Sequence, residues 1–272
     1  MRPVISLTTD FGTTDHFVGT MKGVIAKICA DANVIDITHD IPAYNVLEGA
    51  LAIWPAWRYF PALTIHVLVV DPGVGSERRP ILARIGGHYF IAPDNGVLTF
   101  LLDDIERTGP PPDLHELTTP AYRLGTQSVT FHGRDVFAPA AAHLANQLAC
   151  GNADLSSFGP RIKDPVRLKL EKPTRGPDGV VTGTILKVDR FGNLLTNLQA
   201  ADVADLQDQR FALNLESNTI TRLLKNYMAG KPGEPFAIFG SSCVLEIALN
   251  RGNAAKQLGA SPGDTFTLTS DA

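Results

Sequence analysis

Residues 63–75 read LTIHVLVVDPGVG, and this stretch decides the fold. The run LTIHVLVV is almost wholly apolar and has no polar face, which is typical of a strand buried on both sides in a parallel sheet. It stops at Asp71 and turns through Pro-Gly-Val-Gly. In open α/β sheets, ligands bind beyond the carboxyl ends of the strands. The stretch therefore predicts a buried strand that carries an aspartate to a binding edge.

The residues on either side of this strand alternate between two hydrophobic periods. Short apolar runs predict further strands at 4–9, 34–38, 80–85 and 88–93, the last two as a hairpin across Gly86-Gly87. Apolar residues at helical spacing predict helices at 17–30, 46–60, 97–105 and 134–150. Thr14 or Asp15 is the expected cap of the first helix, and Pro55 should kink the second helix or end it early. This alternation indicates an α/β fold with a mostly parallel sheet covered by helices.

The composition of the sequence changes after Gly151. Residues 158–180 contain four prolines and many charges, which indicates a linker or a poorly packed connection. Short strand-like pieces follow at 180–188, 210–215, 218–224, 236–240, 243–249 and 265–270. Only 252–258 suggests a helix. We therefore predict an N-terminal α/β domain at 1–160 and a smaller C-terminal β-barrel domain at 161–272.

The composition excludes several classes of protein. The chain has 272 residues, 44% of them hydrophobic, and a net charge of -4, so nothing favours binding to nucleic acid or to an anionic membrane. No stretch approaches the roughly 18 apolar residues of a membrane helix. The N-terminus has no apolar signal core, and the three cysteines show no metal or disulfide spacing. A cytoplasmic protein without a membrane segment is the expectation.

Two predicted strands end in aspartate, at Asp10 and Asp71, so both carboxylates should reach the same edge of the sheet. The Pro-Gly-Val-Gly turn would let Arg78 or Arg79 fold back and keep Asp71 ionised. A tight turn with a structural ion pair would have the same sequence.

A second polar stretch, TFHGRDVF, places His132 and Gly133 directly before a predicted helix. The free N–H groups at such a position favour a bound anion and a neutral imidazole, which suits the holding of a water or hydroxide. The simpler alternative is a loop histidine followed by Asp135 as the N-cap residue.

A third stretch lies in the second half, at 187–197, KVDRFGNLLTN. Asp189 and Asn193 flank Phe191 and Gly192, and an aromatic face beside an amide is what a purine ring requires. A hairpin turn built on Gly-Asn would look the same. Tyr44 likewise could stack on a ligand ring or pack against the core.

Taken together and in order, seven stretches resemble one family. They are TTDFG (8–12), IPAYNVLEGA (41–50), DPGVGSERR (71–79), APDNG (92–96), FHGRD (131–135), DRFGNLLTN (189–197) and GSSCVLEIALNRGNAA (240–255). The family is that of the S-adenosylmethionine hydrolases, also called S-adenosyl-L-methionine hydroxide adenosyltransferases, which are relatives of fluorinase and chlorinase. The resemblance runs over nearly the whole chain.

The resemblance implies a reaction, an assembly and a set of site residues. S-adenosylmethionine and water would give adenosine and L-methionine with no metal or other cofactor. The protein would be a homotrimer, with sites between the N-terminal domain of one subunit and the C-terminal domain of the next. The family's catalytic set matches Asp71, Arg78 and His132. Its substrate contacts match Asp10 for the ribose, Tyr44, Phe191 and Asn193 for adenine, Asp189 for the methionine ammonium group, Ser241 and Ser242 for its carboxylate, and Phe131 and Gly133 beside the reacting carbon.

Two departures bear on this expectation. Halogenases lack the aspartate at Asp71 and use a serine where this chain has Gly133, so the resemblance favours water over halide. Cys243 and Val244 stand where Gly and Arg are frequent in the family, which weakens the contact to the methionine carboxylate. The rival readings are a halogenase, a metal-dependent phosphohydrolase that uses Asp10, Asp71, His132 and Asp135 as ligands, and a module that binds adenosine or S-adenosylmethionine without turnover.

Overall fold

The computed structural model describes residues 2–126, 128–206, 211–242 and 244–270. The chain forms two compact units, Met1–Leu168 (unit 1) and Lys169–Ala272 (unit 2). Residues 161–168, which the sequence prediction places in the second domain, are bonded to unit 1. The main-chain N–H of Val166 donates to Asp94, and that of Leu168 donates to the Thr99 hydroxyl.

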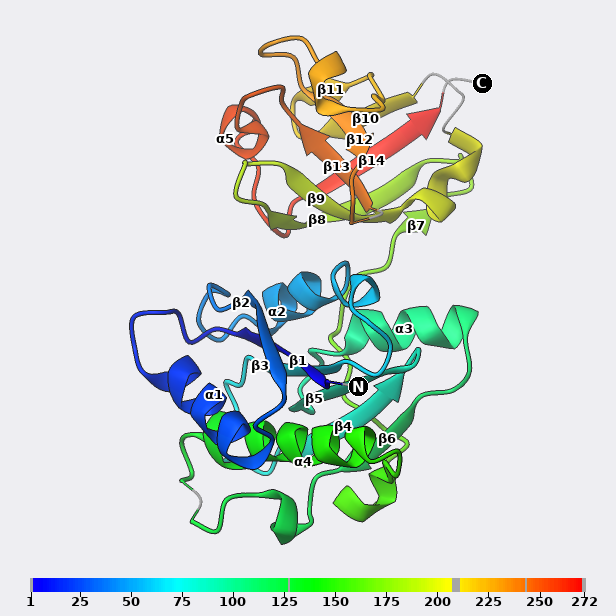
Figure 1. Cartoon of the computed structure of the whole chain (residues 1–272). Coiled ribbons are helices and arrows are strands. Elements are labelled where there is room, and N and C mark those ends of the chain that lie inside the picture. The colour runs from blue at the N-terminus through cyan, green and yellow to red at the C-terminus, as the bar shows by residue number, and fades with distance from the viewer. Residues whose placement is uncertain (1, 127, 207–210, 243, 271–272) are drawn as a thin grey trace. The chain divides into compact units, whose positions relative to one another are not determined.

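Unit 1 is built on a six-stranded sheet in the order β2-β1-β3-β5-β4-β6 (Figure 1). Its strands are β1 (Val4–Thr9), β2 (Asn33–Thr38), β3 (Ile65–Val69), β4 (Pro80–Ile85), β5 (His88–Pro93) and β6 (Asp113–Glu116). The neighbours β2, β1, β3 and β5 are parallel, whereas β4 is antiparallel to both β5 and β6. This confirms the predicted mostly parallel sheet and the hairpin across Gly86-Gly87.

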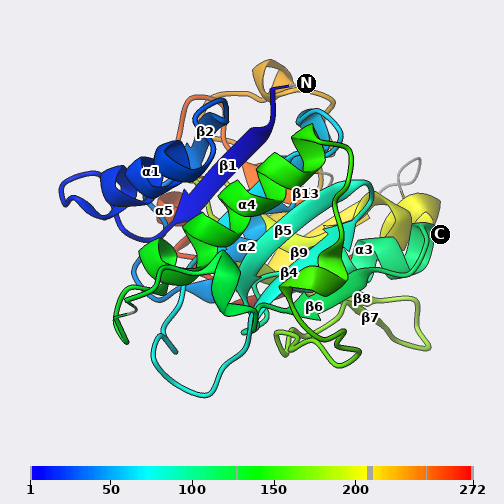
Figure 2. The same ribbon diagram turned by 60° about the horizontal axis from the view of Figure 1, so that its bottom comes forward.

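Helices cover both faces of this sheet. They are α1 (Phe17–Ile28), α2 (Val46–Ile53), α3 (Thr99–Thr108) and α4 (Ala138–Ala149), with 3₁₀ turns at Trp57–Tyr59, Pro120–Tyr122 and Leu155–Phe158 and a π-helical turn at Gly133–Phe137. Figure 2 shows α4 lying along one face of the sheet, and α2 and α3 pack on the opposite face. Every residue of β3 is buried, as expected for a strand covered on both sides.

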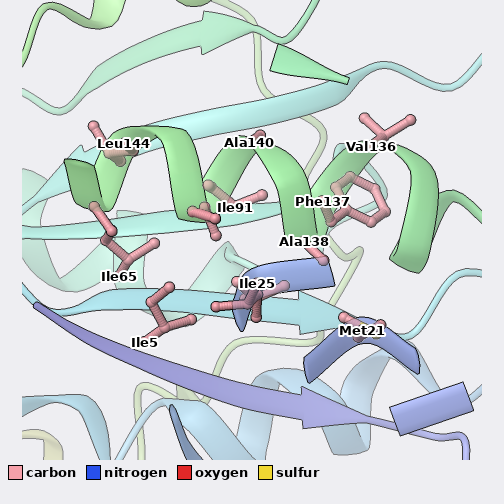
Figure 3. Packing of buried hydrophobic residues seen from close by; sticks show 14 of the residues in the cluster. Ile5, Met21, Ile25, Ile65, Ile91, Val136, Phe137, Ala138, Ala140 and Leu144 are labelled. Atoms are coloured by element: carbon pink, nitrogen blue, oxygen red, sulfur yellow. The ribbon is translucent and has the colours of Figure 1, made fainter. Parts of the chain in front are cut away.

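The largest apolar cluster of unit 1 lies between α1, α4 and the strands β1, β3 and β5 (Figure 3). Met21 and Ile25 of α1 meet Ile5, Ile65 and Ile91 of the strands with essentially no exposure. Burial of this kind contributes about 1.5–3 kcal/mol for each large side chain. The cluster therefore fixes the strands whose carboxyl ends bear the polar residues of interest.

Two local predictions need correction. Neither Thr14 nor Asp15 caps α1: the N-cap residue is His16, and no side chain closes that helix end. The second helix ends at Ile53, just before Pro55, which is one of the two outcomes predicted for that proline. Residues 194–199, for which the sequence predicts no strand, form β9.

Unit 2 is an antiparallel sheet that curls into a nearly closed barrel. Its strands are β7 (Thr174–Arg175), β8 (Val181–Val188), β9 (Leu194–Gln199), β10 (Phe211–Leu215), β11 (Asn218–Ile220), β12 (Phe236–Phe239), β13 (Val244–Ala248) and β14 (Thr265–Ser270), with α5 at Ala254–Leu258 and 3₁₀ turns at Ala200–Leu206 and Tyr227–Ala229. The order is β11-β10-β14-β8-β9-β13-β12. A bridge from Leu223, just past β11, to Ala237 of β12 joins the two ends of this order. The predicted small β barrel is confirmed.

Within the residues that the structure describes, no helix is long and apolar enough to span a bilayer.

Candidate active site

The two strand-end aspartates lie at one edge of the unit 1 sheet. β1 and β3 are parallel neighbours in which Thr9 is paired with Val69, so Asp10 and Asp71 emerge on the same side. Both border an open cavity of about 310 Å³. Its wall is aromatic, because the rings of Phe11, Phe17 and Phe131 pack against one another at centroid distances of 5.1–5.8 Å. The sheet edge thus combines two acids with an apolar wall.

Arg78 connects Asp71 to His132 at this cavity. Its Nε donates to Asp71 Oδ1 at 2.9 Å, and its Nη2 donates to Asp71 Oδ2 and lies 2.8 Å from His132 Nδ1. The Asp71 and Arg78 side chains are only 5% and 9% exposed. A bidentate, largely buried pair of this kind holds both groups in one orientation.

The contact to Arg78 also fixes the tautomer of His132. A guanidinium only donates hydrogen bonds, so Nδ1 must accept, and the neutral ring then carries its proton on Nε2. Burial, followed by the positive charge of Arg78, lowers the pKa of His132 below its usual 6.5. The imidazole is therefore neutral at pH 7, and it offers an N–H donor rather than a free lone pair.

The glycine-rich turn after Asp71 packs closely against the loop before α4, which carries His132. Gly75 has a φ of +80° and lies against the main-chain oxygen of Val129, so that a Cβ at this position would collide with it. The turn is closed by hydrogen bonds from the Val74 N–H to the Asp71 carbonyl and from the Ser76 N–H to the Gly73 carbonyl. The close approach, rather than flexibility, is what requires glycine here.

The adjacent arginine has a different role. Arg79 Nη2 lies 2.6 Å from Asp94 Oδ2, and its Nη1 lies 2.9 Å from Asp164 Oδ1. It therefore ties the start of β4 to the segment that follows β5 and to the connection beyond residue 160. Of the two arginines, the one that contacts Asp71 is Arg78.

Asp10 and Tyr44 form a second element of the cavity rim. The main-chain N–H of Tyr44 donates to Asp10 Oδ2 at 2.8 Å. Tyr44 has a φ of +67°, a strained value for a residue with a side chain, and its ring is 73% exposed. Burial raises the pKa of Asp10, and the charge of Asp71 adds to this rise. The rim thus holds a half-buried carboxylate beside an exposed tyrosine.

His132 directly precedes the π-helical turn that leads into α4. The alternative in which Asp135 caps this helix is wrong, because Asp135 lies inside the turn and is completely buried. Its carboxylate accepts from Arg134 Nε at 2.6 Å and from the Ser128 N–H at 2.7 Å. Asp135 therefore anchors the loop that packs on the glycine-rich turn.

Gly133 lies in tight surroundings at the cavity. A Cβ there would come within 3.1 Å of Met21 Sδ and of the Phe131 ring, and within 3.3 Å of the Phe11 ring. A serine at this position would therefore have to displace its neighbours.

In unit 2, Asp189, Phe191 and Asn193 form one turn between β8 and β9. Asp189 Oδ1 accepts from the N–H groups of Phe191 and Asn193 at 2.8 and 2.9 Å, and Oδ2 accepts from Asn193 Nδ2 at 2.9 Å. The turn projects the Phe191 ring, which is 76% exposed, whereas Asn193 is buried. An exposed aromatic face on a rigid turn is suited to stacking on a flat ring.

Ser241 and Ser242 lie in the turn between β12 and β13, and Cys243 falls outside the described residues. Val244 begins β13 and is buried, so it brings no charge to this turn. Because β13 runs antiparallel to β9, the turn at 189–193 and the turn that contains Ser241 and Ser242 flank opposite ends of β13.

Comparison with known proteins shows that units 1 and 2 match the two domains of one protein family. The model of the SAM hydroxide adenosyltransferase N-terminal domain matches residues 5–153, and that of the C-terminal domain matches residues 183–267. The chain belongs to the SAM hydroxide adenosyltransferase family. An (R)-S-adenosyl-L-methionine hydrolase of Salinispora arenicola is 37% identical over 269 residues, 98% of each chain.

More distant relatives of the SAM hydroxide adenosyltransferases include halogenases. A fluorinase of Actinopolyspora mzabensis is 27% identical over 98% of this chain and 97% of its own. Among solved structures, an uncharacterized conserved protein from Thermotoga maritima superposes with a TM-score of 0.86 at 33% identity, covering 97% of this chain and 99% of that one.

Each unit also contains residues near these sets that the sequence did not single out. Val74 and Thr130 also border the unit 1 cavity. In unit 2, Glu246 is buried in β13 and accepts a hydrogen bond from the Tyr227 hydroxyl at 2.8 Å. A signal for Glu246 was present, since it is the one acid in the apolar run VLEIAL. Tyr227 gave none, because it lies far from that run in the sequence.

Proposed function

We propose that this chain hydrolyses S-adenosyl-L-methionine at the ribose C5′, giving adenosine and L-methionine. The observation that carries the proposal is the Asp71–Arg78–His132 arrangement beside a cavity with an aromatic wall. Family membership and the (R)-S-adenosyl-L-methionine hydrolase at 37% identity support the same reaction. The name of that relative specifies the (R) configuration at sulfur, which we propose for the substrate here.

The chemistry of the proposed substrate explains why the reaction needs few catalytic groups. A sulfonium leaves as a neutral thioether, so neither a metal nor an acid is needed to stabilise the leaving group. The enzyme has to hold a water in line behind C5′ and remove its other solvent. Positioning of this kind supplies about 7–11 kcal/mol in favourable cases.

In the proposed step, the water oxygen bonds to C5′ while the C5′–S bond breaks and sulfur takes the bonding pair. Asp71 accepts the proton that leaves the water, and His132 holds the same oxygen through its Nε2–H. His132 is the weaker candidate for the base, since its Nδ1 lone pair is occupied by Arg78. Arg78 keeps Asp71 ionised and aimed, and the carboxylate screens the sulfonium from the guanidinium.

The remaining residues would bind the two ends of the substrate. We propose that Asp10 takes the ribose hydroxyls and that Tyr44, Phe131 and Gly133 shape the space around the reacting carbon. In unit 2, the turn at 189–193 would hold adenine through Phe191 and Asn193 and the ammonium group through Asp189. Ser241 and Ser242 would offer hydroxyls to the carboxylate.

The rival readings meet different obstacles. A metal-dependent phosphohydrolase would need Asp10, Asp71, His132 and Asp135 as ligands, but Asp135 is held by Arg134 and no group of three metal-binding side chains occurs within the described ranges. A halogenase would need room for a side chain at Gly133, where the neighbours already lie at 3.1 Å. A non-catalytic binding module would not need a water-holding triad.

Product analysis in water labelled with heavy oxygen tests the proposal. The (R) and (S) epimers at sulfur are incubated separately, with EDTA present and with chloride or fluoride added in parallel. We expect labelled adenosine from the (R) epimer at the same rate with and without EDTA. Intact substrate would support the binding module, 5′-halo-adenosine the halogenase, and loss of activity in EDTA a metal enzyme.

The pH dependence of turnover should report the state of His132. Its lowered pKa means that the neutral ring persists below pH 6.5, so kcat/KM should stay level as the pH falls to 6.5. At lower pH, protonation of Nδ1 breaks the contact to Arg78 and kcat/KM should fall. The double variant Asp10→Asn/Glu246→Gln removes from the profile the two acids whose pKa values are raised. A decline that begins above pH 6.5 in this variant would contradict the assignment.

The oligomeric state is a separate prediction. Sedimentation equilibrium should give the mass of three 29.2 kDa chains, as the family resemblance implies. A mass of one or two chains at the concentrations used for activity would contradict it.

A further inference from the structure

Glu246 differs from the other fully buried carboxylates in its partners. Asp94 and Asp135 of unit 1 are each paired with an arginine at 2.6 Å. Glu246 is 4% exposed, and its only hydrogen-bond partner among the described residues is the neutral hydroxyl of Tyr227, which bonds Oε2. Its other oxygen, Oε1, has no partner in that part of the chain. Burial of an ionised carboxylate without a cation is costly, so a compensating charge is expected from elsewhere.

Glu246 also lies between the two turns that would hold the methionine end of the substrate. Its neighbours Leu245 and Ile247 belong to the barrel core, so Glu246 faces the other side of β13. Its Oε1 lies directly against Gly240, the residue before Ser241, and leaves no room for a Cβ there. From the opposite end of the strand, Asp189 acts on it electrostatically.

The charges around Glu246 are all of one kind. Burial raises the pKa of Glu246 and the charge of Asp189 raises it further, while the Tyr227 hydroxyl opposes them. The pKa of Tyr227 is in turn raised by burial and then by Glu246 and Asp189. No cation of the described chain contributes to either shift. Asp189 and Glu246 therefore share an electrostatic environment to which no cation of the described residues contributes.

The hydrogen bonds that Asp189 accepts within its own turn limit how many it can accept from a ligand. Three of its acceptor positions are used to build the turn at 189–193. One remains for a ligand. On the other side of Glu246, Ser241 and Ser242 offer only neutral hydroxyls, and Val244 is buried.

We infer that Glu246 supplies a second negative charge for the substrate's ammonium group, together with Asp189, and is a specificity-determining residue of this enzyme. The inference rests on the proposed function. It means that unit 2 selects the amino group of the methionine end more strongly than its carboxylate. The preferred chemical class is an amine-bearing sulfonium nucleoside, with or without a carboxylate.

Steady-state kinetics with three substrates test this inference. They are S-adenosylmethionine, its analogue without the amino group and its analogue without the carboxylate. With the wild type, we expect a KM about tenfold or more higher without the amino group, and a KM within about threefold without the carboxylate. Glu246→Gln, which preserves an acceptor for Tyr227, should raise the KM of both amine-bearing substrates about tenfold, leave kcat nearly unchanged and not affect the amine-free analogue.

Glu234→Gln is the matched control, because it removes an exposed carboxylate of the same unit that is paired with Arg222. It should leave all three KM values unchanged. An equal change of KM for all substrates in Glu246→Gln would mean a structural role and would overturn the inference. If Glu246→Gln fails to fold, the wild-type kinetics can still contradict the inference. They do so if the KM of the wild type is lower for the amine-free analogue than for the carboxylate-free analogue. A wild type that turns over none of the three would instead overturn the proposed function itself.

Discussion

Asp71→Asn should lower kcat about 10³-fold and weaken the binding of S-adenosylmethionine far less, by about tenfold at most, through the loss of the charge that screens Arg78. The amide preserves the shape of the carboxylate and one acceptor for Arg78, but it cannot take a proton from water. Asp71 is the only member of the triad with a lone pair that Arg78 does not already use, which is why its loss should be the most severe. Single-turnover kinetics, with binding measured separately by calorimetry, separate the two quantities.

Two variants sharpen this result. Asp164→Asn is the control for the loss of one carboxylate from unit 1, because Asp164 is exposed and pairs with Arg79 rather than Arg78; its kcat should match the wild type. His132→Gln retains an acceptor for Arg78 and a donor for water, so it should lose less than Asp71→Asn. A larger loss in His132→Gln than in Asp71→Asn would identify His132 as the base instead.

The order of strands and helices in unit 1 could be predicted from the sequence because burial leaves a clear period. The run at 63–70 is apolar except for Thr64 and His66, and every residue of β3 is buried because the strand is covered on both faces. β6 escaped prediction because Asp113–Glu116 is short and mostly polar. β9 was not predicted for another reason. Leu194, Thr196 and Leu198 alternate as in a half-buried strand, but they directly follow the Gly-Asn pair, which is typical of a turn.

The site was predictable only in part, because spacing along the chain does not determine contacts across it. Asp10 and Asp71 followed from the rule that parallel strands share a carboxyl edge. Arg78 and His132 are 54 positions apart, and nothing local in either stretch specifies that Nη2 meets Nδ1. The choice of Arg78 over Arg79 came from resemblance. The structure adds the physical reason: Arg79, just before β4, pairs with Asp94, which directly follows β5.

The conformation before α4 shows a further limit of sequence reasoning. A polar residue near the start of a helix normally predicts a cap, and Asp135 fits that rule. The π-helical turn changes the geometry and buries Asp135 against Arg134. π-helical turns are rare and frequent at functional sites, so the failure of the ordinary rule here coincides with the position of His132.

Arg78→Met should have the largest effect on stability. The Asp71 side chain is 5% exposed, and without Arg78 it would be a buried carboxylate with no cation. Breaking one side of such a pair costs about 3–5 kcal/mol of unfolding free energy. Methionine retains much of the volume packed against Phe137, so the cost should come from the charge rather than from a cavity. Urea denaturation of the purified variant measures it.

The double variant separates charge from packing. Asp71→Asn in the Arg78→Met background removes the carboxylate that has lost its partner, so the free energy of unfolding should rise again towards that of Asp71→Asn alone. Turnover should remain lost, because neither a base nor its positioning group is present. If the double variant is instead less stable than Arg78→Met, the pair stabilises the fold by packing and the electrostatic account of the triad is wrong.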